Sequence, residues 1–205
     1  MKTSERTYKL TGLTRILGSQ AANPKVRSEY IASKAASLQK GQEETDKLPE
    51  GFEEKGLTVF LRDGGALCMS DYVIKGFLKE ALGALKSQIG IASHASKVDN
   101  FTLITPAYLR FTKGGEPVTE PDFIKERPLR AMTMQGPRVS VTASECIEPG
   151  WELTFTITLL DNPASPKSRA MTFEVIEEAL DYGAFKGLGQ WRNGQNGRFT
   201  WERVS

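Results

Sequence analysis

The sequence predicts an α+β domain in which an antiparallel sheet is backed by two helices. Three observations carry this prediction. Residues 151–161 alternate apolar and polar side chains, as a half-buried strand does. Two segments, one from Ser70 to Leu85 and one at about 171–182, repeat apolar residues at the spacing of an amphipathic helix. Shorter strand-like stretches lie around these helices, which gives the order β-α-β-β-α-β.

The first strand is predicted at 6–17, where Tyr8 and Leu10 alternate with polar neighbours. The stretch that follows, at about 25–56, is polar, acidic in its later part at 41–56, and has no sustained periodicity. This composition predicts a surface insertion, with a short helix at 25–35 as its one expected element. Two short strands are then expected around a turn at Asp63-Gly64-Gly65.

The first helix begins at Ser70, and either Ser70 or Asp71 is expected to cap its free N–H groups. Its apolar face consists of Ile74, Phe77, Leu78, Ala81, Leu82 and Leu85. Beyond this helix, residues 100–131 contain strand-like runs on either side of a Thr-Lys-Gly-Gly-Glu-Pro tip at 112–117. The pattern predicts a hairpin at 100–131 that projects into solvent.

The second half of the chain contains another predicted strand at 137–147, followed by the strand at 151–161. The buried face of the latter is Trp151, Leu153, Phe155, Ile157 and Leu159. The second helix directs Phe173, Ile176, Ala179 and Leu180 inward. It is expected to end at Gly183 as its C-cap, before a last strand at 198–204. With the insertion set aside, this order predicts a single ferredoxin-like (RRM-like) βαββαβ domain over residues 1–205.

The net charge of the 205-residue chain is only +2, so a site for a polyanion has to come from local clustering of charge. Such clusters are present. Residues 7–28 and 186–200 contain lysine and arginine but no carboxylate, while acidic residues gather at 41–56. Two positive segments, one near each end of the chain, therefore indicate a binding site for a polyanion.

The sequence also predicts a cytoplasmic protein without a membrane contact. It contains no run of roughly 20 apolar residues, and its N-terminus lacks the apolar run of a secretory signal. Cys68 and Cys146 lie far apart without CxxC spacing, which is typical of buried, reduced cysteines. No cluster of metal ligands and no nucleotide-binding P-loop is present, so no cofactor or metal is expected.

Residues 187–201, Gly-Leu-Gly-Gln-Trp-Arg-Asn-Gly-Gln-Asn-Gly-Arg-Phe-Thr-Trp, form a flexible, cationic and aromatic segment. Glycines allow the backbone to approach a ligand closely, exposed N–H groups favour anions, and arginine binds phosphate through two donors. Trp191 or Trp201 offers a ring on which a base can stack. These features predict a site for single-stranded nucleic acid. The alternative stays open that the glycines form a tight connection out of the helix and that one or both of Phe199 and Trp201 face the core.

Three stretches resemble the repeat-associated mysterious protein (RAMP) superfamily, the RNA-binding proteins of CRISPR systems. They are YKLTGLTRILGSQ at 8–20, ALCMSDYVIKGFLKEAL at 66–82 and GLGQWRNGQNGRF at 187–199, and they occur in the order found in that family. The resemblance implies a modified ferredoxin-like fold that binds single-stranded RNA across its sheet and glycine-rich loop. It further implies that the hairpin at 100–131 is the thumb with which backbone subunits contact their neighbours and bend RNA.

The resemblance carries RNA contacts over to Gly18, Ser19, Lys75, Gly187, Gly189, Arg192, Gly194, Gly197 and Arg198. The clustering of charge and the stacking argument add Arg15, Lys186 and Trp191. Family members that cut target RNA have an aspartate after the first strand, whereas residues 18–28 contain no carboxylate, so no catalytic residue is expected.

The favoured function is a non-catalytic protein that binds single-stranded, guide-like RNA, together with other CRISPR-complex subunits or copies of itself. One alternative is a RAMP-like interaction protein that associates with a CRISPR complex or inhibits it as a decoy. A third is a metal-independent endoribonuclease that uses His94 or Tyr182 as its acid or base.

Overall fold

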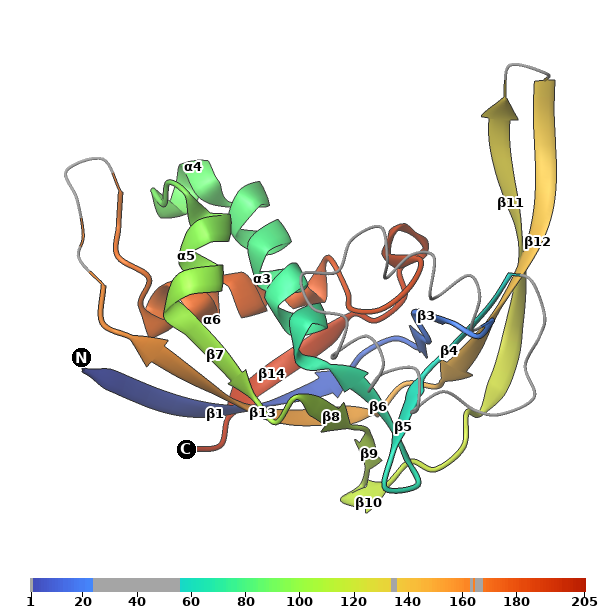
Figure 1. The fold of residues 1–205 in the computed structure, drawn as a ribbon, viewed down its shortest axis with the longest axis horizontal. Helices are drawn as coiled ribbons and strands as arrows, with labels where there is room; N and C mark the ends of the chain where they lie inside the picture. The colour runs from blue at the N-terminus through green and yellow to red at the C-terminus, as the bar shows by residue number, and fades with distance from the viewer. Residues whose placement is uncertain (1, 24–55, 134–135, 163, 165–167) are drawn as a thin grey trace.

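The computed structural model describes residues 2–23, 56–133, 136–162, 164 and 168–205. Most of the predicted insertion at 25–56, with its short helix at 25–35, lies outside these residues. The described chain is a mixed α+β structure with four α-helices and three sheets (Figure 1). None of these helices has the length and apolar character that crossing a membrane requires.

The largest sheet contains the two chain ends and the strongest predicted strand. Its main strands are β7 (Thr102–Thr105), β13 (Glu152–Leu160), β1 (Thr3–Gly12) and β14 (Phe199–Arg203), in this order and all antiparallel to their neighbours. The register places Tyr8 opposite Phe155 and Leu10 opposite Leu153. All four side chains are buried, so the alternation in each strand directs one face of the sheet into the core.

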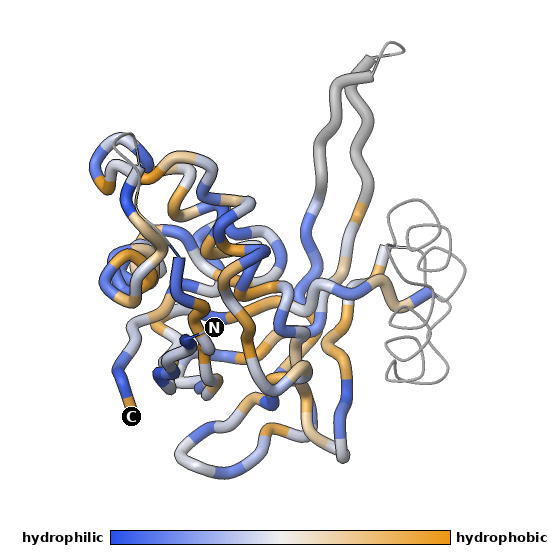
Figure 2. Tube along the Cα trace, turned by 60° about the vertical axis from the view of Figure 1, so that its left-hand side comes forward, coloured by the Kyte–Doolittle hydropathy of each residue, from blue (hydrophilic) through white to orange (hydrophobic). Residues whose placement is uncertain are grey.

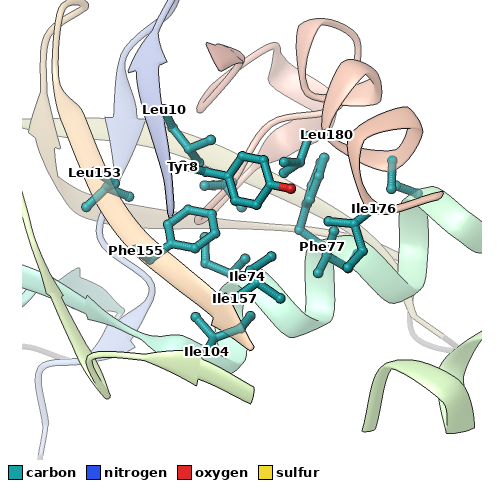
Figure 3. Close-up of a cluster of buried hydrophobic side chains, with 14 of the residues drawn as sticks. Tyr8, Leu10, Ile74, Phe77, Ile104, Leu153, Phe155, Ile157, Ile176 and Leu180 are labelled. Atoms are coloured by element: carbon teal, nitrogen blue, oxygen red, sulfur yellow. The ribbon is translucent and has the colours of Figure 1, made fainter. Parts of the chain in front are cut away.

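Three helices lie on that face of the sheet (Figure 1). They are α3 (Asp71–Ala84), α5 (His94–Phe101) and α6 (Phe173–Asp181), with the short α4 (Lys86–Ile89) between the first two. Tyr8, Phe155 and Ile157 of the sheet and Ile74, Phe77 and Ile176 of the helices share one apolar cluster (Figure 3). Burial of this cluster is the driving force that holds helices and sheet together.

The two predicted helices are confirmed, and so are their inward faces. In α3 the predicted apolar residues are buried, except Leu85, which is partly buried just after the helix. Ser70 occupies the N-cap position, but its side chain makes no capping hydrogen bond. In α6 the four predicted residues are buried. Both cysteines are buried and form no disulfide.

Gly183 does not act as the predicted left-handed C-cap of α6. The helix runs into a 3-10 turn, η1 (Tyr182–Ala184). A Cβ on Gly183 would lie 2.3 Å from the ring of Phe199. The glycine is therefore required for close packing of this turn against β14, and not for a positive φ.

The second sheet contains the projecting hairpin. Its strands are β11 (Phe123–Thr133), β12 (Gly136–Ile147), β4 (Leu57–Val59), β3 (Gln20–Ala21) and β2 (Ile16–Leu17). β11 and β12 pair along eleven residues and extend away from the helix-covered body (Figures 1 and 2). The strand predicted at 137–147 is thus half of this hairpin.

The prediction of a projecting hairpin at 100–131 is therefore wrong in its position. This region holds β7, β8 (Tyr108–Arg110), β9 (Thr112–Lys113), β10 (Glu116–Pro117) and the first part of β11. The turn at Gly114-Gly115 is confirmed, with φ of 60° and 87°, but it joins strands of two residues. The long hairpin was missed because a ribbon that projects from the body has no continuous core-facing side and so lacks strict alternation.

The other predicted turn is confirmed in a third sheet. β5 (Leu61–Asp63) and β6 (Ala66–Ser70) pair around Gly64 and Gly65, whose φ values are 58° and 82°, and β8 pairs with β6. Helix α5 was not predicted. Val98 is its one buried residue, so its sequence carries no apolar period.

Replacing Phe155 with alanine should lower the free energy of unfolding by about 3–5 kcal/mol, because a buried aromatic ring is lost and a cavity remains. Urea denaturation measures the change. Thr154→Ala is the matched control, since Thr154 lies next to Phe155 in the same strand but is exposed, and its effect should stay within about 1 kcal/mol. Equal effects of the two substitutions would contradict the assignment of the buried face.

Candidate nucleic-acid interface

The glycine loop, residues 187–198, packs along the turn that follows β1. Gly197 N donates to Arg15 O at 2.6 Å, and Leu13 N donates to Arg198 O at 2.8 Å. Further along, Gln190 N donates to Leu17 O at 3.3 Å. The described parts of the two positive segments therefore lie side by side.

Two of the predicted glycines make the loop close on itself. Leu188 N donates to Gly197 O at 2.9 Å. A Cβ on Gly187 would lie 2.2 Å from Asn196 O, and a Cβ on Gly197 would lie 2.0 Å from Leu188 O. Gly197 also has a φ of 73°. The two arms of the loop therefore touch backbone to backbone, which only glycine permits. At these positions the structure supports the tight-connection alternative.

Gly189 and Gly18 mark two further close approaches of backbone to backbone. Gly189 has a φ of 74°, and a Cβ there would lie 2.7 Å from Leu17 O. A Cβ on Gly18 would lie 2.4 Å from the carbonyl carbon of Val59. These two glycines hold the loop and β4 against the segment after β1, so their role in the described chain is structural.

The cations in and beside the loop have partners within the chain, which the sequence did not predict. Arg192 forms an ion pair with Glu80 of α3, and Lys186 Nζ lies 3.2 Å from the other carboxylate oxygen of Glu80. Arg198 Nε donates to Ala184 O at 2.6 Å. The loop sequence contains no acid, so the pairing was invisible until the fold brought α3 to it.

Glu80 is held in its ionised form by these two cations. Burial by itself favours the neutral carboxyl, but the hydrogen bond from Lys186 and the charge and hydrogen bond of Arg192 outweigh it, so the pKa of Glu80 lies below its ordinary value. The side chains of the three residues are about one-third exposed. Glu80 thus fixes the loop to α3 while both cations stay accessible to solvent.

Trp191 connects the loop to the projecting hairpin. Lys125 Nζ lies 5.3 Å from the centre of the ring and Arg127 Cζ lies 5.2 Å from it. A Cβ on Gly194 would lie 2.7 Å from the same ring, so Gly194 packs directly against it. The Trp191 ring thus contacts β11 and its own loop while staying 41% exposed, and the predicted stacking of a base on it stays a prediction. Two cations over one indole stabilise the contact between hairpin and loop.

The other residues singled out from the sequence, Arg15, Lys75 and Trp201, have different surroundings. Arg15 lies over Phe123 of β11, with Cζ 5.7 Å from the ring centre, and 3.9 Å from a carboxylate oxygen of Glu148. Lys75 lies on α3, half-buried, and forms no ion pair with a described residue. Trp201 is partly buried and packs edge-on against Tyr8 at 5.6 Å, while Phe199 is buried in the core, as the alternative held.

A cleft of about 650 Å³ lies between the glycine loop, α3 and the segment that contains β3 and β4. Of the predicted residues, Ser19, Gly189 and Arg192 line it. Lys75 does not, although its neighbour Gly76 does. The lining residues that sequence reasoning missed are Gln20, Ala21, Thr58, Tyr72, Val73, Gly76, Phe77, Glu80 and Leu188. Gln20 beside Ser19, Gly76 beside Lys75 and Leu188 between Gly187 and Gly189 offered a signal by position; the others offered none.

The cleft combines hydroxyl and amide groups with an apolar floor. Gln20 Nε2 donates to the hydroxyl of Tyr72 at 2.8 Å, and Tyr72 is 42% exposed. A Cβ on Gly76 would meet nothing within 4 Å, so this turn of α3 faces open space. Among the described residues, no group of three His, Cys, Asp or Glu side chains is placed to hold a metal ion. His94 begins α5, beside Gly83, and does not line the cleft.

Comparison with known proteins gives no match, either to a family model or to a curated protein.

Gly197→Ala should destabilise the protein far more than Gly114→Ala. Both glycines have positive φ, so both substitutions carry a strain of roughly 1–2 kcal/mol, but a Cβ on Gly114 meets nothing within 4 Å. At Gly197 the collision with Leu188 adds about 1–3 kcal/mol. Urea denaturation measures both changes. Similar losses of stability at the two positions would show that the loop does not close as described.

Glu80→Gln should reduce stability at neutral pH, by at most about 1 kcal/mol because the ion pairs are partly exposed. The folded pKa of Glu80 is lowered from 4.5, so its stabilisation is complete above that value and is lost as the pH falls through the folded pKa. The difference in unfolding free energy between wild type and variant should therefore vanish in acid. A difference that grows in acid would contradict the ion pairs.

Proposed function

We propose that this protein binds single-stranded RNA without cutting it, in the manner of a RAMP backbone subunit. One observation carries the proposal: the three segments on which the resemblance rests meet around one cleft. Ser19 comes from the segment after β1, Gly76 from α3, and Gly189 and Arg192 from the glycine loop. A single binding site in this cleft explains why the three motifs, which lie far apart in the sequence, occur together.

The strand order supports a ferredoxin-like core within this more complex set of sheets. In chain order, β1, α3, β7, β13, α6 and β14 follow the β-α-β-β-α-β sequence, and their strands are arranged as β7-β13-β1-β14, antiparallel throughout. In this interpretation α4, α5 and the two smaller sheets are additions, and the β11–β12 hairpin takes the place that was assigned to residues 100–131.

The chemistry of the cleft suits an unpaired nucleotide better than a duplex. Tyr72 offers an aromatic ring for stacking, and Ser19, Thr58 and Gln20 offer groups that hydrogen-bond to base edges and to the 2′-hydroxyl. Val73 and Phe77 of the apolar floor lie beneath them. Bases of single-stranded RNA are free to enter such a site, whereas stacked and paired bases are not.

The paired cations take part by exchanging partners. Partly exposed ion pairs contribute only about 0–1 kcal/mol, so a phosphate can replace Glu80 as the partner of Arg192 and Lys186 at little expense. Arginine also binds phosphate through two parallel hydrogen bonds. In the absence of RNA, Glu80 keeps both side chains at the rim of the cleft in an ordered position.

The sequence of the β11–β12 hairpin is basic toward its tip. Its outer part, residues 128–142, contains Arg130 and Arg138 and no acidic residue. A basic ribbon of this kind is suited to follow an RNA backbone or to reach a neighbouring subunit, either a copy of this chain or another component of a CRISPR complex.

The satisfied cations also favour a second candidate, an interaction protein that associates with a CRISPR complex or inhibits it without holding RNA itself. Lys186, Arg192 and Arg198 are all engaged inside the chain. In a protein that does not bind RNA, these three cations are expected to have partners within the chain.

Lys186→Ala combined with Arg192→Ala should weaken binding of a short fluorescent oligouridylate, measured by anisotropy over a series of salt concentrations. Each lost phosphate contact removes about 0.7 from the slope of log affinity against log salt, so the double variant should lose about 1.4. Glu80→Gln should tighten binding, because both cations are released to phosphate.

The matched control is Arg110→Ala combined with Lys113→Ala, an arginine and a lysine that are ion-paired with Asp63 and Asp122, away from the cleft. Its affinity and salt slope should equal those of wild type. If the wild-type protein does not bind the oligonucleotide, or if both double variants weaken binding alike, the proposed RNA site is wrong and the second candidate is favoured.

A further inference from the structure

Arg127, on β11 at the base of the projecting hairpin, is a buried cation without an acidic partner. Arg127 is only 4% exposed. Nη1 donates to Ser144 Oγ at 2.9 Å, while Nε has no hydrogen-bond partner. In the described part of the chain, no carboxylate lies within ion-pairing distance of it. Burial alone lowers the pKa of Arg127 below its ordinary value, with no opposing charge.

A second buried charge in the same sheet, Glu145, differs from Arg127 because it has both an ion-pair partner and a hydrogen-bond partner. Glu145, only 2% exposed, lies on β12 and accepts hydrogen bonds from Arg62 Nη2 at 2.7 Å and from Phe60 N at 2.8 Å. Buried charges in proteins are generally paired in this way, because an uncompensated one is strongly destabilising. Arg127 departs from this rule.

Arg127 contacts Ser144 and Trp191, each of which lies next to a residue of the cleft lining. On one side, Ser144 Oγ lies 2.6 Å from Thr58 Oγ1, and Thr58 lines the cleft. On the other side, the guanidinium lies over Trp191, which directly precedes Arg192 of the cleft lining. The Trp191 ring packs against the guanidinium, and the buried Nε–H has no acceptor in the described chain.

We propose that Arg127, together with the hydroxyl groups of Ser144 and Thr58, forms an anion-binding subsite beside the cleft that takes a phosphate group. The planar guanidinium supplies donors in fixed directions, and the hydroxyls supply donors that rotate to suit the anion. Lys125, over the same indole ring, adds a second positive charge. The subsite rests on the proposed function if its phosphate belongs to an RNA backbone, but free phosphate satisfies the same chemistry.

Arg127→Met tests the subsite, because methionine fills similar space without charge. Binding of the oligouridylate to this variant should weaken about tenfold, the equivalent of one charge-assisted contact, and its salt slope should fall by about 0.7. Arg127→Lys should keep most of the salt slope but lose affinity, since lysine is a point charge without the fork. Arg110→Met, a matched loss of one positive charge away from the cleft, should behave as wild type.

A second measurement uses inorganic phosphate as the probe and does not depend on RNA. Phosphate should raise the melting temperature of wild-type protein relative to chloride at equal ionic strength, as a ligand of the folded state does. This rise should be absent from Arg127→Met and kept in Arg110→Met. In chloride, Arg127→Met should melt at the wild-type temperature or above it, because an uncompensated buried charge has been removed.

The outcomes separate the subsite from the proposed function. RNA binding that is insensitive to Arg127→Met, without any phosphate effect, overturns the subsite and leaves the proposed function standing. A phosphate effect that depends on Arg127, in a protein that binds no RNA, supports the subsite and overturns the proposed function. A variant that melts at lower temperature in chloride but keeps the phosphate response assigns Arg127 a purely structural role and overturns the subsite.

Discussion

The contact between the two arms of the glycine loop is the constraint on which the rest of the cleft depends. Gly187 and Gly197 bring backbone against backbone at distances that exclude a side chain, and the hydrogen bond from Gly197 N to Arg15 O fastens the closed loop to the turn after β1. Leu188, Gly189 and Arg192 line the cleft because this closure places them there. The loop is therefore a rigid wall, although its glycine content is typical of a flexible segment.

Charge around the cleft is distributed unevenly. On the wall formed by α3 and the glycine loop, one carboxylate, Glu80, holds two cations. On the side toward the hairpin, Arg127 is buried without a carboxylate. The described surroundings of the cleft thus have more positive than negative charge, even though the whole chain is nearly neutral. A local field of this kind attracts anions whatever the net charge of the molecule.

The hairpin and the cleft are parts of one arrangement. The base of β11 contacts the body through Phe123, which lies beside Arg15, and through Lys125 and Arg127, which lie over Trp191. β12 also pairs with β4, where Thr58 lines the cleft. The cleft therefore lies close to the residues that fix the hairpin to the body.

The sequence alone determined α3, α6 and β13, and it singled out the glycine loop by its unusual content of glycine, arginine and tryptophan. Each of these elements has one face toward a single core, or an unusual local composition, and such signals lie within a short window of residues. Only the tertiary structure decided that the long hairpin is β11–β12, that Trp191 packs against Lys125 and Arg127, and that Arg192 is paired with Glu80. These outcomes rest on contacts between residues far apart in the chain, which no local period records, because a charge or a ring finds its partner only when the fold brings the two together.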